Sequence, residues 1–174
     1  EKRNKYVKHL YKKLHREGQL ERDVDRLVRN DRIAWGASMI ACNDADAMVT
    51  GNIRHYAASI EKLKKVTEPR PGEEIFGMTM ITLKGKTVLV ADTNVQDFPS
   101  PERLIKVSKS CVRVARLFGF DPKVAFLSHS TFGKPISRNT KHVRDAIELL
   151  KKEKVDFKFD GEMQPDVALN PIYQ

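Results

Sequence analysis

An apolar run passes directly into a polar loop in the sequence Val124-Ala125-Phe126-Leu127-Ser128-His129-Ser130-Thr131-Phe132-Gly133-Lys134-Pro135. A short apolar run that ends in such a loop is typical of a buried strand. Helical spacing then predicts a helix over residues 139–152, and a further short strand is expected at 156–159. The expected inward positions of that helix are Val143, Ala146, Ile147 and Leu150. Strand, helix and strand in this order predict an α/β fold with a largely parallel sheet.

The first third of the chain is expected to be mainly helical. Apolar residues at helical spacing predict helices over 2–17, 21–28 and 33–42, with Gly18 as the end of the first. A short buried strand is expected at 45–49, followed by a tight turn at Thr50-Gly51 and a helix over 53–66. A glycine turn between a strand and a helix presents backbone N–H groups to an anion.

The segment Glu68-Pro69-Arg70-Pro71-Gly72-Glu73 is the expected boundary between two subdomains, 1–70 and 71–174, because helices and central strands avoid its prolines. Beyond it, apolar runs at 75–83 and 87–91 flank Lys84-Gly85-Lys86, which predicts a hairpin. Ser100-Pro101-Glu102 has the residues of a helix start, and Gly119 is the expected end of that helix. Its expected apolar face consists of Leu104, Val107, Cys111, Val114 and Phe118.

Composition favours a folded protein without membrane spans. The 174 residues are 40% hydrophobic and 32% charged, and no apolar run reaches the roughly 20 residues that a span requires. With no export signal, the expected location is the cytoplasm. Cys42 and Cys111 match no zinc or redox spacing and are expected to be buried reduced thiols. Both ends of the chain are abrupt, which predicts a piece of a longer protein.

A net charge of +9 is concentrated in the first predicted helix. Three explanations stay open: a solvated helix face, a surface for the phosphates of coenzyme A or for a partner subunit, and a nucleic-acid surface. No nucleic-acid motif or aromatic platform accompanies the charge, so nucleic acid is not an expected partner.

Ligands of open α/β sheets bind at the carboxyl ends of strands, where three polar segments of this chain are expected. They begin at Thr50, Asp92 and Ser128, and the third can cradle a phosphate or can be an ordinary polar turn. The predicted ligand-binding residues are Thr50, Gly51, Arg54, Thr93, Asn94, Ser128, Ser130, Thr131, Gly133, Asp160 and Gln164.

Each of the other candidate site residues has both a functional and a purely structural explanation. His129 is a possible general base or a simple loop residue. The run from Asp160 to Asp166 is either a site wall or a solvated turn, and Asp44 and Asp46 are functional acids or turn caps. Arg54 holds an anion or lies on a helix surface. No metal site is expected, because no His and Cys join these acids at ligand spacing.

Four segments in this order resemble the phosphate acetyl/butyryltransferase family. They are Asp44-Ala45-Asp46-Ala47-Met48-Val49-Thr50-Gly51, Val88-Leu89-Val90-Ala91-Asp92-Thr93-Asn94-Val95, Val124 to Gly133, and Phe159-Asp160-Gly161-Glu162-Met163-Gln164-Pro165-Asp166-Val167-Ala168. The resemblance implies two α/β domains of phosphotransacetylase type, a fold also like that of isocitrate and isopropylmalate dehydrogenases, incomplete in this chain. The family's catalytic residues are then expected beyond Gln174.

The first helices look like the family branch that is fused behind the catalytic half of bacterial NADP-dependent malic enzymes. The supporting segments are Arg3-Asn4-Lys5-Tyr6-Val7, Arg29-Asn30-Asp31-Arg32 and Gly51-Asn52-Ile53-Arg54-His55-Tyr56. Glu61 stands where true transacetylases have a phosphate-binding arginine, so this branch is expected to bind acetyl-CoA as a regulatory and oligomerisation module. NADP and a divalent metal then belong to the upstream half, and the expected partner is a second copy. An active acyltransferase is the alternative.

Overall fold

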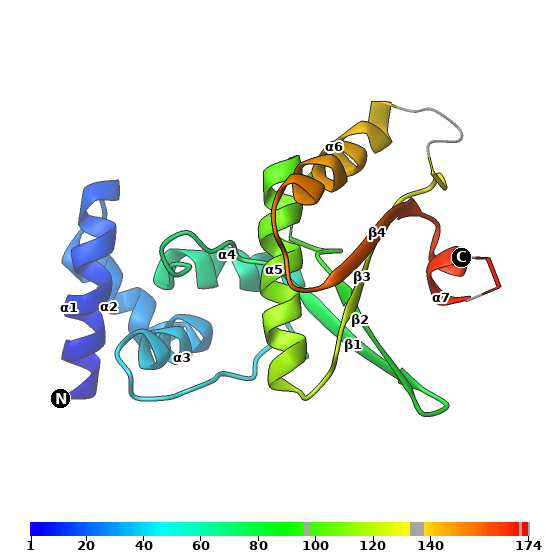
Figure 1. Ribbon diagram of the computed structural model, residues 1–174. Coiled ribbons are helices and arrows are strands. Elements are labelled where there is room, and N and C mark those ends of the chain that lie inside the picture. Colours follow the sequence, from blue (N-terminus) through cyan, green and yellow to red (C-terminus); the bar gives the residue numbers. More distant parts are fainter. Residues whose placement is uncertain (96–97, 133–137, 171, 174) are drawn as a thin grey trace. The chain divides into compact units, whose positions relative to one another are not determined.

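The computed structural model describes residues 1–95, 98–132, 138–170 and 172–173, and of residues 138 and 139 it describes only the backbone (Figure 1). The chain divides into two compact units, Glu1–Pro69 and Arg70–Gln174. Each unit has its own hydrophobic core. Their assignment as parts of a first and a second subdomain stays a prediction.

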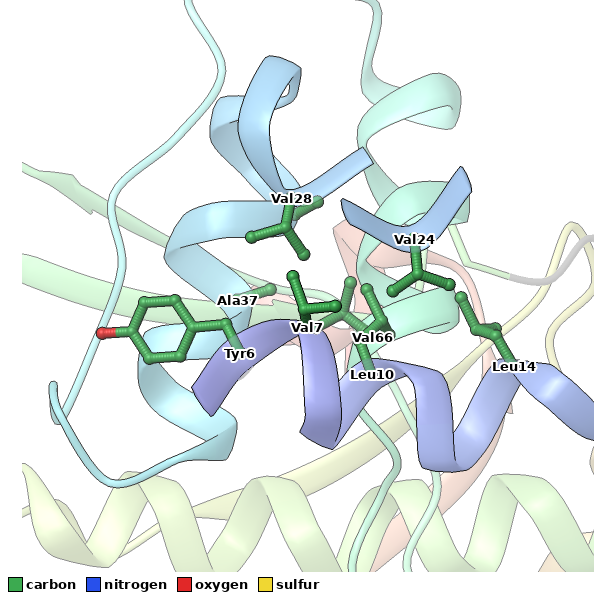
Figure 2. Packing of buried hydrophobic residues seen from close by; sticks show 9 residues of the cluster. Tyr6, Val7, Leu10, Leu14, Val24, Val28, Ala37 and Val66 are labelled. Carbon is green, nitrogen blue, oxygen red and sulfur yellow. The ribbon is translucent and has the colours of Figure 1, made fainter. Parts of the chain in front are cut away.

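The first unit is a small helical bundle. Its elements are α1 (Lys2–Leu14), the 3-10 turn η1 (His15–Glu17), α2 (Glu21–Asn30), α3 (Arg32–Ala41) and α4 (Tyr56–Val66). The helical spacing that predicts the first helix is confirmed, since its apolar residues Tyr6, Leu10 and Leu14 are fully buried. Figure 2 shows Leu14 pointing toward Val24 and Val7 toward Val28, both on α2, while the ring of Tyr6 points away from these valines and packs on Trp35 of α3. Helical spacing in the sequence therefore gives the core of this unit directly.

The prediction of a strand at 45–49 is wrong. Residues 42–55 run through turns and bends, and the side chain of Val49 is fully exposed. A strand requires a partner for its backbone hydrogen bonds, and the first unit contains no strand among its described residues. Side-chain contacts hold the segment instead. Met48 packs so closely on Gly36 of α3 that a Cβ atom at position 36 would overlap the Met48 sulfur.

Asp44, in the same segment, has a structural role. Its carboxylate accepts a 2.8 Å hydrogen bond from the Tyr6 hydroxyl and a 2.8 Å charged hydrogen bond from Lys5. Both partners lie on α1, so Asp44 fastens the connecting segment to the bundle. These contacts are not those of a turn cap, and they give Asp44 a stabilising role that neither of the two readings of the sequence describes.

The second unit begins with the predicted hairpin. Strands β1 (Met78–Leu83) and β2 (Lys86–Ala91) pair antiparallel, from Met78 with Ala91 to Leu83 with Lys86. Lys84 and Gly85 form the turn, with φ of 49° and 76°. Positive φ at both turn positions matches the right-handed twist of a hairpin, and glycine adopts it without strain.

A parallel pair of strands forms the rest of the second unit. Strand β3 (Lys123–Leu127) pairs with β4 (Lys158–Met163), and helix α6 (Arg138–Lys152) connects them. Helix α5 (Pro101–Leu117) packs on α6, and the short α7 (Pro165–Leu169) follows β4 (Figure 1). The core consists of Ile105, Phe126, Val143, Ala146, Ile147 and Leu150. The predicted strand–helix–strand unit and all four inward positions of α6 are therefore confirmed.

Three expectations for this unit require correction. The described strands form two separate pairs, one of them antiparallel, rather than a largely parallel sheet. Strand β4 starts at Lys158, two residues later than expected, and it includes Glu162. Phe118 is 59% exposed because it lies beyond the end of α5 at Leu117, and Ile105, which is not in the expected apolar face, is buried.

Cys42 and Cys111 are free and half-buried, less enclosed than expected. Burial raises the pKa of the Cys111 thiol to about 11, with a smaller contribution from the charge of Asp92. Among the described residues, no helix combines the length and the apolar character that crossing a membrane demands.

Candidate functional site

The loop after β3 lies against the end of β4, where the carboxyl ends of the two parallel strands meet. The backbone N–H of Ser128 donates to the Met163 carbonyl at 3.0 Å, and that of Phe132 donates to the Glu162 carbonyl at 2.8 Å. The segment Ser128–Phe132, called the anion loop below, is thus tied at both ends to β4. This is the place where open α/β sheets bind ligands.

A buried polar cluster lies beneath the anion loop. Ser130 is fully buried, and its hydroxyl donates to Glu162 Oε1 at 2.9 Å. The guanidinium of Arg144, on α6, reaches the same oxygen at 2.9 Å and also donates to Thr140 Oγ1 at 3.2 Å. Glu162 is 1% exposed, so its charge is held inside the protein by Arg144.

Gln164 holds the outer side of the anion loop. Its backbone N–H donates to Thr131 Oγ1 at 3.2 Å, and its side-chain amide donates to the His129 carbonyl at 2.8 Å. Ser128 Oγ accepts from the Ser130 N–H at 3.3 Å. Thr131 Oγ1 is an acceptor in its bond, so it keeps a proton that a ligand oxygen can accept. The Ser128 hydroxyl also lies 3.4 Å from Ser130 Oγ, and it is the donor in that contact because Ser130 donates to Glu162.

A second cluster lies where β2 ends. Asp92 has φ of 51°, accepts from the Gly77 N–H at 3.2 Å and forms a 3.0 Å ion pair with Arg103 of α5. Arg103 also binds Glu74 at 2.8 Å and the Ile75 carbonyl at 2.7 Å. The cluster fastens the hairpin to α5. Thr93 and Asn94 follow it as exposed residues.

Arg54, the predicted anion ligand of the first unit, is part of an ion-pair cluster. It donates to Asp31 at 3.0 Å, and Lys62 binds the same carboxylate oxygen. Asp31 also caps α3, because its other oxygen accepts from the N–H groups of Ile33 and Ala34. Burial alone would raise the pKa of Asp31, but the hydrogen bonds from Lys62, Arg54 and the two backbone groups outweigh it and lower the pKa.

The predicted ligand residues are divided between the two units. Ser128, Ser130, Thr131 and Gln164 meet at the anion loop, whereas Thr50, Gly51 and Arg54 belong to the first unit. Asp160 is exposed and accepts from its neighbour's N–H at 2.8 Å. Gly133 lies outside the described residues, as do Lys134 and Pro135.

Within the run from Asp160 to Asp166, the residues up to Met163 belong to strand β4 rather than to a solvated turn, and Glu162 and Gln164 contact the anion loop. The exposure of Glu162 was predicted wrongly. Three acids close together in the sequence suggest a solvated segment, but the side chain of Glu162 is buried. Arg144 was missed altogether. It stands fourteen residues beyond Ser130 in an ordinary amphipathic helix, and only the tertiary structure brings it to the site. No group of three metal-binding side chains occurs within residues 1–95, 98–132, 138–170 and 172–173.

Comparison with known proteins places this geometry in a family. The family model described as phosphate acetyl/butaryl transferase matches residues 1–173. The chain belongs to this family. A phosphotransacetylase from Streptococcus pyogenes of known structure superimposes with a TM-score of 0.79 at 26% identity, over 96% of this chain and 52% of that one. This similarity confirms the phosphotransacetylase-like α/β fold but lends no support to the further likeness to isocitrate and isopropylmalate dehydrogenases.

The relatives include two kinds of named protein. An NADP-dependent malic enzyme of Rhizobium meliloti is 44% identical over 95% of this chain, which spans 22% of that enzyme. A phosphate acetyltransferase of Nitratidesulfovibrio vulgaris is 30% identical over 83% of this chain, which spans 21% of it. The suspected family is thereby confirmed, and the chain spans about a fifth of the length of these relatives.

Proposed function

We propose that this chain is part of the phosphotransacetylase-like domain of an NADP-dependent malic enzyme. The observation that carries the proposal is the 44% identity, over 95% of the chain, to a protein of that name. In such a protein the other half oxidatively decarboxylates malate to pyruvate and holds the NADP and the divalent metal. This domain binds acetyl-CoA and joins copies of the protein into an oligomer in the cytoplasm.

The anion loop is the part of this chain that supports ligand binding best. It offers the hydroxyl proton of Thr131 at the carboxyl ends of two parallel strands, and the half-buried Ser128 hydroxyl can exchange its long 3.4 Å contact with Ser130 Oγ for a ligand oxygen. A phosphate or thioester oxygen of acetyl-CoA accepts such hydrogen bonds. Ser130 takes part indirectly, since its side chain is buried and its proton is directed at Glu162.

Regulation follows if acetyl-CoA prefers one conformation of the oligomer. A ligand shifts an equilibrium only by its difference in affinity for the two states, and that shift is then felt at the malate site. Steady-state malate kinetics of the full-length protein, with and without saturating acetyl-CoA, test this directly. We expect a change in the rate or in the KM for malate; identical kinetics would remove the regulatory role.

Acyl transfer between coenzyme A and phosphate is a second candidate, because relatives and a solved structure carry phosphate acetyltransferase and phosphotransacetylase names. By the resemblance in sequence, Glu61 on α4 stands where true transacetylases have a phosphate-binding arginine, and a carboxylate in that role would repel phosphate. We therefore expect no thioester formation from acetyl phosphate and coenzyme A by the full-length protein. Turnover that rises with enzyme concentration would favour the transferase.

A further inference from the structure

We propose that Glu162 and Arg144 are a positioning pair that fixes the shape of the anion loop, so that Ser128 and Thr131 face the ligand and Ser130 does not. This inference rests on the proposed ligand site and names the residues that build it. Neither residue is expected to touch the ligand. They act through the backbone and the hydroxyl of the loop.

A bulge in β4 places Glu162 where it can do this. Phe126 pairs with Gly161 and Leu127 pairs with Met163, so Glu162 is an extra residue between two paired ones. Side chains of a regular strand alternate between two faces, but Glu162 and Met163 are consecutive and both are buried. A bulge redirects a side chain in this way, and bulges are frequent beside functional sites. Here it turns a carboxylate inward beneath the loop.

A carboxylate at 1% exposure is stable only with a positive or hydrogen-bonded partner. Arg144 supplies the charge at 2.9 Å and is itself oriented by Thr140, one helical turn earlier on α6. Because an ionised carboxylate only accepts, Ser130 must be the donor in its 2.9 Å bond to Glu162. The direction of the Ser130 hydroxyl is thereby fixed by the pair.

The backbone of Glu162 holds the other end of the loop. Its carbonyl accepts from the N–H of Phe132, a residue with φ of 48°. A bulky residue in the left-handed region costs free energy and persists only where its surroundings enforce it. One residue of β4 therefore grips the loop at Ser130 through its side chain and at Phe132 through its backbone. A preorganised loop binds a ligand without a further ordering cost.

Two measurements on the full-length protein test the pair: amide hydrogen exchange without ligand, and the Kd for coenzyme A by calorimetry. For Glu162→Ala we expect faster exchange at Ser128, Ser130 and Phe132 and a Kd weakened by about tenfold, the scale of one hydrogen bond to a charged group. Glu162→Gln keeps an acceptor for Ser130 and should recover part of both effects. Ser130→Ala should speed amide exchange in the loop while the amides of the core stay protected. This variant replaces Glu162→Ala in the test if Glu162→Ala fails to fold.

The matched control is Glu148→Gln, which removes an exposed ion pair with Lys151 on the same helix as Arg144. It should change neither measurement. Wild-type loop exchange in both Glu162→Ala and Ser130→Ala would overturn the positioning pair, as would protection lost uniformly over β3 and α6. If the wild-type protein binds no coenzyme A, the proposed function fails, while the exchange data still decide whether the pair fixes the loop.

Discussion

At the scale of single residues, buried and half-buried carboxylates organise both units. Asp31, Asp44, Asp92 and Glu162 each hold a cation from a different element. Each therefore joins segments that the apolar core alone does not fix. Breaking such a pair by removing one partner is costly, because the remaining charge is left without compensation.

Asp31 offers a first test of this role. Asp31→Ala removes the cap of α3 and the carboxylate that binds Arg54 and Lys62, so we expect a loss of about 2 kcal/mol in the free energy of unfolding. Chemical denaturation measures it. Asp25→Ala, which breaks exposed pairs with Arg3 and Arg29, is the control and should cost less than about 1 kcal/mol. Equal losses would contradict a special role for Asp31.

The same carboxylate predicts a dependence on acid. The folded state lowers the pKa of Asp31, so the stabilisation is present above the ordinary pKa of aspartate, about 3.9, and is lost as the pH falls below it. As the pH falls from 5 to 3, the free energy of unfolding should therefore decrease more for the wild-type protein than for Asp31→Ala. Parallel losses in both proteins would contradict this.

Tyr6 predicts the opposite dependence, at alkaline pH. Its burial, followed by its hydrogen bond to Asp44, raises its pKa to about 12. A raised pKa favours the protonated phenol in the folded state, so its contribution is full below an ordinary pKa of about 10 and is lost as the pH rises toward 12. Denaturation of the wild type and of Tyr6→Phe at increasing pH should show a steeper loss for the wild type. Identical slopes would contradict the prediction.

At the scale of elements, the contact between β3 and β4 depends on Gly161. A Cβ atom there would lie 2.6 Å from the Phe126 carbonyl oxygen, and φ is 140°. We expect Gly161→Ala to destabilise the second unit by about 3 kcal/mol or more, since strain and overlap add. Gly119→Ala is the control: φ is 81° there, but the space is open, so about 1 kcal/mol is expected. Thermal unfolding compares the two.

The elements that sequence patterns predicted well are those fixed by local signals. Ser100 accepts from the Arg103 N–H and starts α5 as expected, and Lys84-Gly85 turns the hairpin. The pattern failed where the outcome depends on distant partners. An apolar run at 45–49 finds no neighbouring strand, and the bulge at Glu162 places an acid inside a strand. Neither feature has a signal within its own segment.

At the scale of the whole molecule, the four family motifs serve different ends. Asp44 and Asp92 stabilise their own units, and within the second unit the motifs of β3 and β4 meet as a candidate ligand site. The sequence was sufficient for the family and for most members of the anion loop. It was insufficient for Arg144, because a helix surface position acquires its role only when α6 packs across β4.

The central claim is that acetyl-CoA binds at the anion loop. Its most direct test is a calorimetric titration of acetyl-CoA into the full-length protein and into Ser128→Ala, Thr131→Val and the control Glu148→Gln. We predict saturable binding to the wild type and the control, and a Kd weakened by about fivefold to tenfold in each loop variant, as expected for one lost hydrogen bond. No heat of binding in the wild type, or equal affinities in all four proteins, would contradict the claim.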